Sequence, residues 1–214
     1  LCNVRFHAGA ENQGPDFLHP AKAGEWGGFR CNQADRHRVA DYHAPADGCH
    51  DPHNGHNLKP GDTIEVHWVF STCDVKPGKS LAACSSKTCT NPTLRVESQV
   101  FVLVDTGHGH GHATGVRKFS DYDYPGHMAG SGLHQPKSLP TQTGKAVQFR
   151  GSTTNEKYNE TNCSDLQVTW RVRSQCAMLD IASLHAWCKS NAFDENHAHG
   201  TRPLVTAPSL LSKI

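Results

Sequence analysis

Apolar and polar residues alternate over several short stretches of the chain, and a period of two is typical of β-strands. The clearest case is the segment 63–70. One face of this strand would carry the apolar residues Ile64, Val66, Trp68 and Phe70. Glu65 and His67 would take the opposite face. The same reasoning predicts strands at residues 2–7, 92–104, 145–152 and 166–173.

The spacing changes to that of a helix near the C-terminal end of the chain. Within 180–191, apolar residues recur at helical intervals, and Asp180 is suited to cap the first turn. Segment 8–60 is rich in Gly, Pro, Asn, Asp and His and predicts a long folded loop region. The pattern therefore predicts an α+β fold that is mostly β, with long loops and a C-terminal helix. We expect a single domain over 1–214, built on a central, largely antiparallel sheet.

Composition excludes several classes of partner. The 214 residues carry a formal net charge of +1, so the chain lacks the basic excess typical of nucleic-acid-binding proteins. No apolar run approaches the roughly 20 residues of a membrane-spanning helix. We therefore expect no nucleic-acid partner and no membrane span.

The nine cysteines are dispersed along the chain and form no tight C-x-x-C pair, which disfavours a structural zinc knuckle. Dispersed cysteines are typical of disulfides in exported proteins, and an odd count leaves one cysteine over. Three cysteines within 73–89 predict a local disulfide, and Cys31 and Cys49 are expected to pin the loop region. Together with a start at Leu1, as in a processed chain, this predicts a secreted or periplasmic protein.

Histidine is the second unusual residue, with 16 in the chain. His7 and His67 both lie on predicted strands, each near a glutamate: Glu11 follows His7, and Glu65 precedes His67. Ligands from neighbouring strands converge above a sheet, and each ligating imidazole needs an acceptor for its second nitrogen. A polar face on such strands could meet solvent, a hydrogen-bond network or a metal. The pattern of two strands predicts a metal site with His7 and His67 as ligands and with Glu11 and Glu65 orienting them.

Several blocks of the sequence together resemble the delta-class carbonic anhydrases of diatoms and bacteria. The blocks are "LCNVRFHAGAEN", "GDTIEVHWVFSTCDVKPGKSLAAC", "NPTLRVESQVFVLV", "SGLHQPKSLPTQTG", "LQVTWRVR", "LHAWCK" and "HAHGTRPLV". The resemblance implies a secreted or periplasmic Zn²⁺ enzyme that interconverts carbon dioxide and bicarbonate. Hydroxide formed on the zinc would attack carbon dioxide, and a histidine would carry the proton out.

The resemblance also implies a ligand pattern similar to that of the alpha class: His-x-His, then Glu-His, then Glu-x-His on the adjacent strand. On this chain the first motif reads Arg5-Phe6-His7, the second Glu11-Asn12 and the third Glu65-Val66-His67. Arginine has no lone pair to offer a metal. Arg5 is therefore not a ligand, and either a third ligand comes from elsewhere or the chain has lost catalytic zinc.

Other histidines are candidates for the third position. His134 lies in "SGLHQP", one of the resembling blocks, and is our prediction for the third zinc ligand, with a backbone-bonded loop residue as the alternative. His197 and His199 form a second x-spaced pair, for which a surface turn is the alternative. His108, His110 and His112 alternate with glycine in a loop that either binds metal loosely, carries protons or is simply solvated.

Two other functions stay open on the sequence alone. The first is a catalytically silent relative of the carbonic anhydrases, in which Arg5 fills the metal position with its own charge. The second is a histidine-rich extracellular metal-binding protein that uses the Gly-His loop at 106–115. Metal stoichiometry separates these two functions from the enzyme. The enzyme needs one tightly bound zinc ion, the silent relative binds none, and the metal-binding protein binds several zinc ions weakly.

Overall fold

The structure is a computed structural model that describes residues 1–21, 28–52, 55–107, 114–121, 145–152, 162 and 166–201. Its strands are β1 (Asn3–Ala8), β2 (His19–Pro20), β3 (Phe29–Arg30), β4 (His50–Asp51), β5 (His56–Asn57), β6 (Thr63–Ser71), β7 (Leu94–Val104), β8 (Val116–Arg117), β9 (Ala146–Ser152), β10 (Gln167–Asp180) and β11 (His199–Gly200). Its helices are the 3-10 turns η1 (Ala34–His37), η2 (Leu81–Cys84) and η3 (Phe119–Asp121) and the α-helix α2 (Ile181–Lys189).

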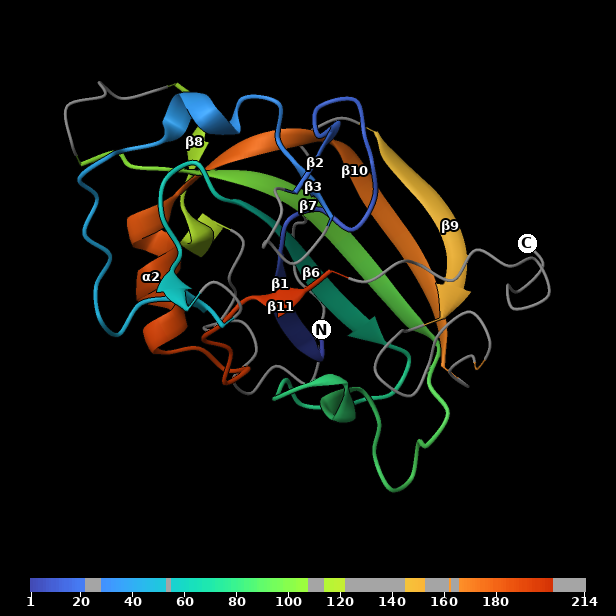
Figure 1. The fold of residues 1–214 in the computed structure, drawn as a ribbon. Coiled ribbons are helices and arrows are strands. Elements are labelled where there is room, and N and C mark those ends of the chain that lie inside the picture. The colour runs from blue at the N-terminus through green and yellow to red at the C-terminus, as the bar shows by residue number, and fades with distance from the viewer. Residues whose placement is uncertain are drawn as a thin grey trace.

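Seven strands form one mixed sheet in the order β11-β1-β6-β7-β10-β8, with β9 also paired to β10 (Figure 1). The centre of the sheet, β1-β6-β7, is antiparallel. β9 is antiparallel to β10, whereas β11 is parallel to β1, and β10 is parallel to both β7 and β8. The mostly β fold with a C-terminal helix is confirmed, and its sheet is mixed because β10 returns to the sheet in the same direction as β7.

The predicted elements are present with small shifts at their ends. β1, β6, β7 and β9 lie within a residue or two of the predicted strands, while β10 continues past the prediction to Asp180. The predicted helix is α2, and its cap is also confirmed, because the Asp180 carboxylate accepts a hydrogen bond of 3.0 Å from the Ser183 amide. Within the described residues, no helix has the length and apolar character needed to cross a membrane.

Alternation in the central strands divides the sheet into two different faces. The even-numbered residues of β1 and β6, such as Phe6 and Trp68, belong to the main core together with Leu184 and Trp187 of α2. The Phe6 and Trp187 rings meet edge to face with centroids 6.3 Å apart. The odd-numbered residues Arg5, His7, Glu65 and His67 are therefore directed to the face away from α2. This face is also covered, since His7, Glu65 and His67 are all buried.

Four disulfides cross-link the chain: Cys2–Cys84, Cys31–Cys176, Cys49–Cys188 and Cys73–Cys89. The predicted local bridge within 73–89 is Cys73–Cys89, and the loop region is pinned by Cys31 and Cys49, each joined to the C-terminal part of the chain. Cys163, the ninth cysteine, lies outside the described residues.

Candidate functional site

The register of β1 and β6 places the predicted site residues beside one another. Arg5 is the Cα partner of His67, and His7 is the partner of Glu65. On the far side of β6, His67 is paired with Ser98 of β7. The rings of His7 and His67 lie with centroids 4.6 Å apart, so the predicted approach of these two histidines across neighbouring strands is confirmed.

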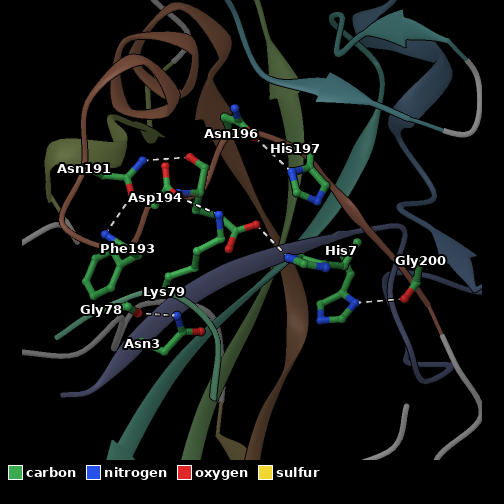
Figure 2. A network of polar contacts seen from close by, with 12 residues as sticks. Asn3, His7, Gly78, Lys79, Asn191, Phe193, Asp194, Asn196, His197 and Gly200 are labelled. Carbon is green, nitrogen blue, oxygen red and sulfur yellow. Dashed lines mark hydrogen bonds and ion pairs between the residues drawn. The ribbon is translucent and has the colours of Figure 1, made fainter. Parts of the chain in front are cut away.

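His7 is held by the last strand of the sheet. Its Nδ1 atom lies 3.1 Å from the carbonyl oxygen of Gly200, in β11, and a carbonyl can only accept, so Nδ1 carries the proton (Figure 2). The Nε2 atom is buried and has no hydrogen-bond partner among the described residues. Burial, followed by the charges of His67 and Arg5, holds the pKa of His7 well below its usual range. The ring is therefore neutral at pH 7, with a free lone pair on Nε2.

His67 is held through Nε2, whereas His7 is held through Nδ1. Its Nε2 atom lies 3.1 Å from the Oε1 atom of Glu65 and donates to that carboxylate. Its Nδ1 atom is buried and lacks a hydrogen-bond partner in the described part of the chain. Buried polar atoms without partners are uncommon in folded proteins and call for an explanation. Two neighbouring imidazoles that each present one such nitrogen are candidate metal ligands.

Glu65 is the acceptor that fixes this arrangement. Besides His67, its carboxylate accepts hydrogen bonds from the Ser98 hydroxyl and, at 2.7 Å, from the Glu11 amide. Burial opposes ionisation of Glu65, but these donors outweigh it, and the pKa of Glu65 lies below its ordinary value. Glu65 is thus an ionised carboxylate whose oxygens are already engaged, which suits it to orient a ligand rather than to be one.

The Glu11 side chain lies between the two rings. One of its oxygens is 3.6 Å from Nδ1 of His7, and the other is 3.8 Å from Nε2 of His67. Burial raises the pKa of Glu11 to about 7, and the nearby Glu65 carboxylate adds to the shift. Glu11 is therefore a carboxyl group that exchanges its proton near neutrality, next to both candidate ligands.

Arg5 lies two residues before His7 on β1, at the position where the sequence pattern predicts another histidine. Its Nε atom is buried and makes no hydrogen bond to the residues described. Burial lowers the pKa of Arg5, while the carboxylates of Glu11 and Glu195 oppose that shift. Glu11 and Glu195 therefore supply the negative charge that acts on Arg5, and only the fold brings residue 195 near β1.

A second group of polar side chains lies on and before β11. Glu195, His197 and His199 offer ligand atoms that lie within 4.8 Å of one another. His199 is the Cα partner of His7, and the two rings have centroids 5.7 Å apart. The surface-turn alternative for this histidine pair is therefore wrong for His199, which is part of the sheet. His134 and the histidines of the Gly-His loop at 108–112 lie outside the described residues.

A zinc site of the expected kind has three protein ligands. The described residues supply two suitable nitrogens, Nε2 of His7 and Nδ1 of His67, and Arg5 stands where the third would be expected. A second possible set, Glu11, Glu65 and His67, also brings ligand atoms within 4.8 Å of one another. The donors fit a buried transition-metal site in part, with one ligand still to be supplied.

Comparison with known proteins gives one match. A sequence model described as delta carbonic anhydrase matches residues 1–183, which is most of the chain and includes Arg5, His7, Glu11, Glu65 and His67. No curated protein sequence and no solved structure matches the chain.

Proposed function

The chain belongs to the delta carbonic anhydrase family, and from that premise we propose that it is a zinc-dependent enzyme for the reversible hydration of carbon dioxide to bicarbonate. One observation carries the proposal. His7 and His67 each have one ring nitrogen bonded to an oxygen acceptor and the other buried without a partner. Imidazoles oriented in this way bind metals in proteins.

Each residue has a separate task in this proposal. His7 binds Zn²⁺ through Nε2 and His67 binds it through Nδ1, while Gly200 and Glu65 hold the two rings at their other nitrogens. Bound zinc lowers the pKa of a water ligand to about 7 and so supplies a nucleophile at neutral pH. Glu11, whose pKa is about 7, lies near both rings and exchanges protons in the same pH range.

The third ligand is the open part of the proposal. Arg5 cannot serve, because a guanidinium has no lone pair and keeps its positive charge. We assign the third position to His134, on the resemblance of its "SGLHQP" block to the family. Arg5 remains beside His7 in this arrangement, and its charge repels a divalent cation. We therefore expect a weaker zinc site than one built from an uninterrupted His-x-His motif.

A catalytically silent relative is the second candidate, and Arg5 is the observation that favours it. The guanidinium is partly enclosed in the site, and its counter-charges are Glu11 and Glu195. A fixed cation balanced in this way substitutes electrostatically for a metal ion. In that case the chain binds no zinc at His7 and His67, and the family's chemistry is absent.

The setting of the protein follows from its cross-links. Four disulfides persist in oxidising compartments and are rare in the cytosol. We propose a secreted or periplasmic protein in a single domain over 1–214, with carbon dioxide and bicarbonate as its small-molecule substrates.

Metal analysis paired with a hydration assay tests the function. The purified chain is loaded with Zn²⁺, dialysed, and compared with His67→Ala and with the surface control His56→Asn. We expect zinc-dependent hydration of carbon dioxide that His67→Ala abolishes and His56→Asn leaves intact. A chain that retains no zinc dependent on His67 and shows no hydration activity would favour the silent relative, and activity that survives His67→Ala would contradict the proposed site.

A further inference from the structure

The side chains around β11 form a cluster that the buried His7–His67 pair does not use. The cluster consists of Glu195, His197 and His199, and it shares no member with the group formed by Glu11, Glu65 and His67. His199 lies in β11, and His197, two residues before it, forms an isolated bridge with His50. Their rings lie with centroids 5.0 Å apart.

The hydrogen bonds of the cluster leave lone pairs available. Nδ1 of His197 lies 2.9 Å from the side-chain oxygen of Asn196 and donates to it, which leaves Nε2 as the acceptor nitrogen (Figure 2). Nε2 of His199 lies 2.7 Å from Oε1 of Glu195 and donates to that carboxylate. A metal ion can bind both atoms when that proton moves to Nδ1 of His199, which leaves the imidazole neutral.

The backbone around Glu195 is fixed before any ligand arrives. The Asn191 side chain donates to the Glu195 carbonyl at 2.7 Å and accepts from the Glu195 amide at 3.1 Å. Lys79 and Asp194 form an ion pair of 2.7 Å beside it, so the lysine charge is compensated. Figure 2 shows Asn191, Asp194 and Lys79 grouped around this turn. The turn therefore holds the Glu195 carboxylate in position against β11.

The loop that carries His50 braces the other side of the cluster. The Ala198 amide donates to the His50 carbonyl at 2.9 Å, and the rings of His50 and His197 stack with centroids 5.9 Å apart. The Cys49–Cys188 disulfide ties this loop to α2. His50 thus lies next to His197 but outside the set of three candidate ligands.

The cluster differs from the buried pair in its access to solvent. The His199 side chain is 36% exposed and that of Glu195 is 7% exposed. His197 and His50 are also partly exposed. By contrast, the His67 side chain is only 1% exposed. A hydrated metal ion can therefore reach the β11 cluster without opening of the sheet.

We propose that Glu195, His197 and His199 form a second site, for a divalent transition-metal ion such as Zn²⁺, at the partly exposed strand β11. Two neutral imidazoles and one carboxylate place a single negative charge around the dication, and imidazole favours zinc, copper and nickel over magnesium and calcium. Ligand atoms of tetrahedral zinc lie roughly 3.3 Å apart, as bonds of about 2.0–2.2 Å require. Modest side-chain rotations achieve that from a starting set within 4.8 Å.

The site is tested with Zn²⁺ on the full-length chain after chelator treatment. Zinc is titrated in competition with a chromophoric chelator into the wild type, Glu195→Gln, His197→Asn and His67→Ala, with His56→Asn as the matched surface control. We expect Glu195→Gln and His197→Asn each to weaken one zinc-binding event at least about tenfold. His67→Ala and His56→Asn are expected to retain that event. Isotherms of Glu195→Gln and His197→Asn that match the wild type would overturn the proposal.

A second measurement uses the wild type, so its result does not depend on whether the variants fold. Histidines are modified with diethylpyrocarbonate with and without Zn²⁺, and the peptides are quantified by mass spectrometry. We expect Zn²⁺ to protect His197 and His199 at least about fivefold while His56 stays reactive. Equal reactivity of His197 and His199 at saturating zinc would show that no metal binds there. Because neither readout measures carbon dioxide hydration, this proposal stands or fails independently of the proposed function.

Discussion

The Nδ1 atom of His7 lies 3.1 Å from the carbonyl oxygen of Gly200, so the ring of a residue near the N-terminus is oriented by a strand formed almost 200 positions later. The same strand places His199 opposite His7 in the register of the sheet. β11 is therefore the structural link between the buried pair, His7 and His67, and the β11 cluster. The four predictions below test this arrangement residue by residue.

The first prediction concerns the orienting role of Glu65. Glu65→Gln removes the negative charge that holds Nε2 of His67, while the side chain keeps its size. We expect zinc at the buried site to bind about 10–100 times more weakly, as is usual when the acceptor behind a ligating histidine is changed. Competition with a chromophoric chelator measures the affinity. Ser98→Ala, which removes another hydrogen bond to Glu65, serves as the milder control, and an affinity for Glu65→Gln equal to the wild type would refute the role.

The second prediction is a pH dependence of stability that arises at His7. Burial, then the charges of His67 and Arg5, lower the pKa of His7 in the folded chain, with a further contribution from His199. The unfolded chain, with a histidine pKa of about 6.5, therefore binds more protons below that pH, and stability falls on acidification. At pH 5.5 the His7 contribution to the loss is at most about 1.4 kcal/mol relative to pH 8.

Chemical denaturation of the metal-free chain at pH 8 and pH 5.5 measures this loss, with His7→Gln as the comparison. We expect the variant to lose less free energy of unfolding than the wild type over this interval. Glu11 faces the same ring and titrates with the opposite sign, since its raised pKa favours the folded state on acidification. Equal losses in wild type and His7→Gln would mean that His7 is protonated in the folded chain.

Much of the fold was predictable because its signals are local. Alternation over 63–70 defined β6, and the helical spacing after Asp180 defined α2 together with its cap. β10 was predicted too short because the stretch beyond residue 173 alternates poorly and pairs with β7 through a register shift between Val172 and Cys176. β11 has only two residues, too few for any period to be visible, and it forms because β1 offers a free edge.

The candidate site was predictable only where its residues share a strand. Glu65 and His67 are two apart, so their common face follows from the pleat. The partner of Arg5 does not follow from local sequence, because Glu195 reaches the site through the turn after α2. Disulfide pairing is likewise non-local, since several connectivities satisfy the same cysteine count. Local sequence patterns do not specify how strands that are far apart along the chain pair with one another.

The third prediction concerns the disulfide behind the β11 cluster. Cys49 and Cys188 are 139 residues apart in sequence, and removing a native bridge typically costs 2–5 kcal/mol. We expect the double variant Cys49→Ser/Cys188→Ser to lower Tm by about 5–15 °C, measured by calorimetry at constant pH. The control is Cys73→Ser/Cys89→Ser, whose bridge spans only 16 residues and is expected to cost less. A larger loss of Tm for the control would contradict the expectation that a disulfide closing a longer loop stabilises the folded chain more.

The last prediction concerns Arg5, which is the Cα partner of His67 and shares a face of β1 with His7. Its guanidinium lies in the field of two carboxylates, Glu11 and Glu195, and it adds positive charge beside the nitrogen that would bind zinc. Arg5→His removes a permanent charge and adds an imidazole at the strand position that the family pattern gives to a ligand. We expect zinc affinity to rise at least about tenfold, which corresponds to about 1.4 kcal/mol, and hydration of carbon dioxide to rise with it.

Arg5→Gln is the matched control, since it removes the charge without supplying a ligand, and its gain should be smaller. If both variants bind zinc and hydrate carbon dioxide as the wild type does, Arg5 does not stand at the metal position. If Arg5→His alone gains both properties, the arginine is the residue that limits the chemistry of this member of the family.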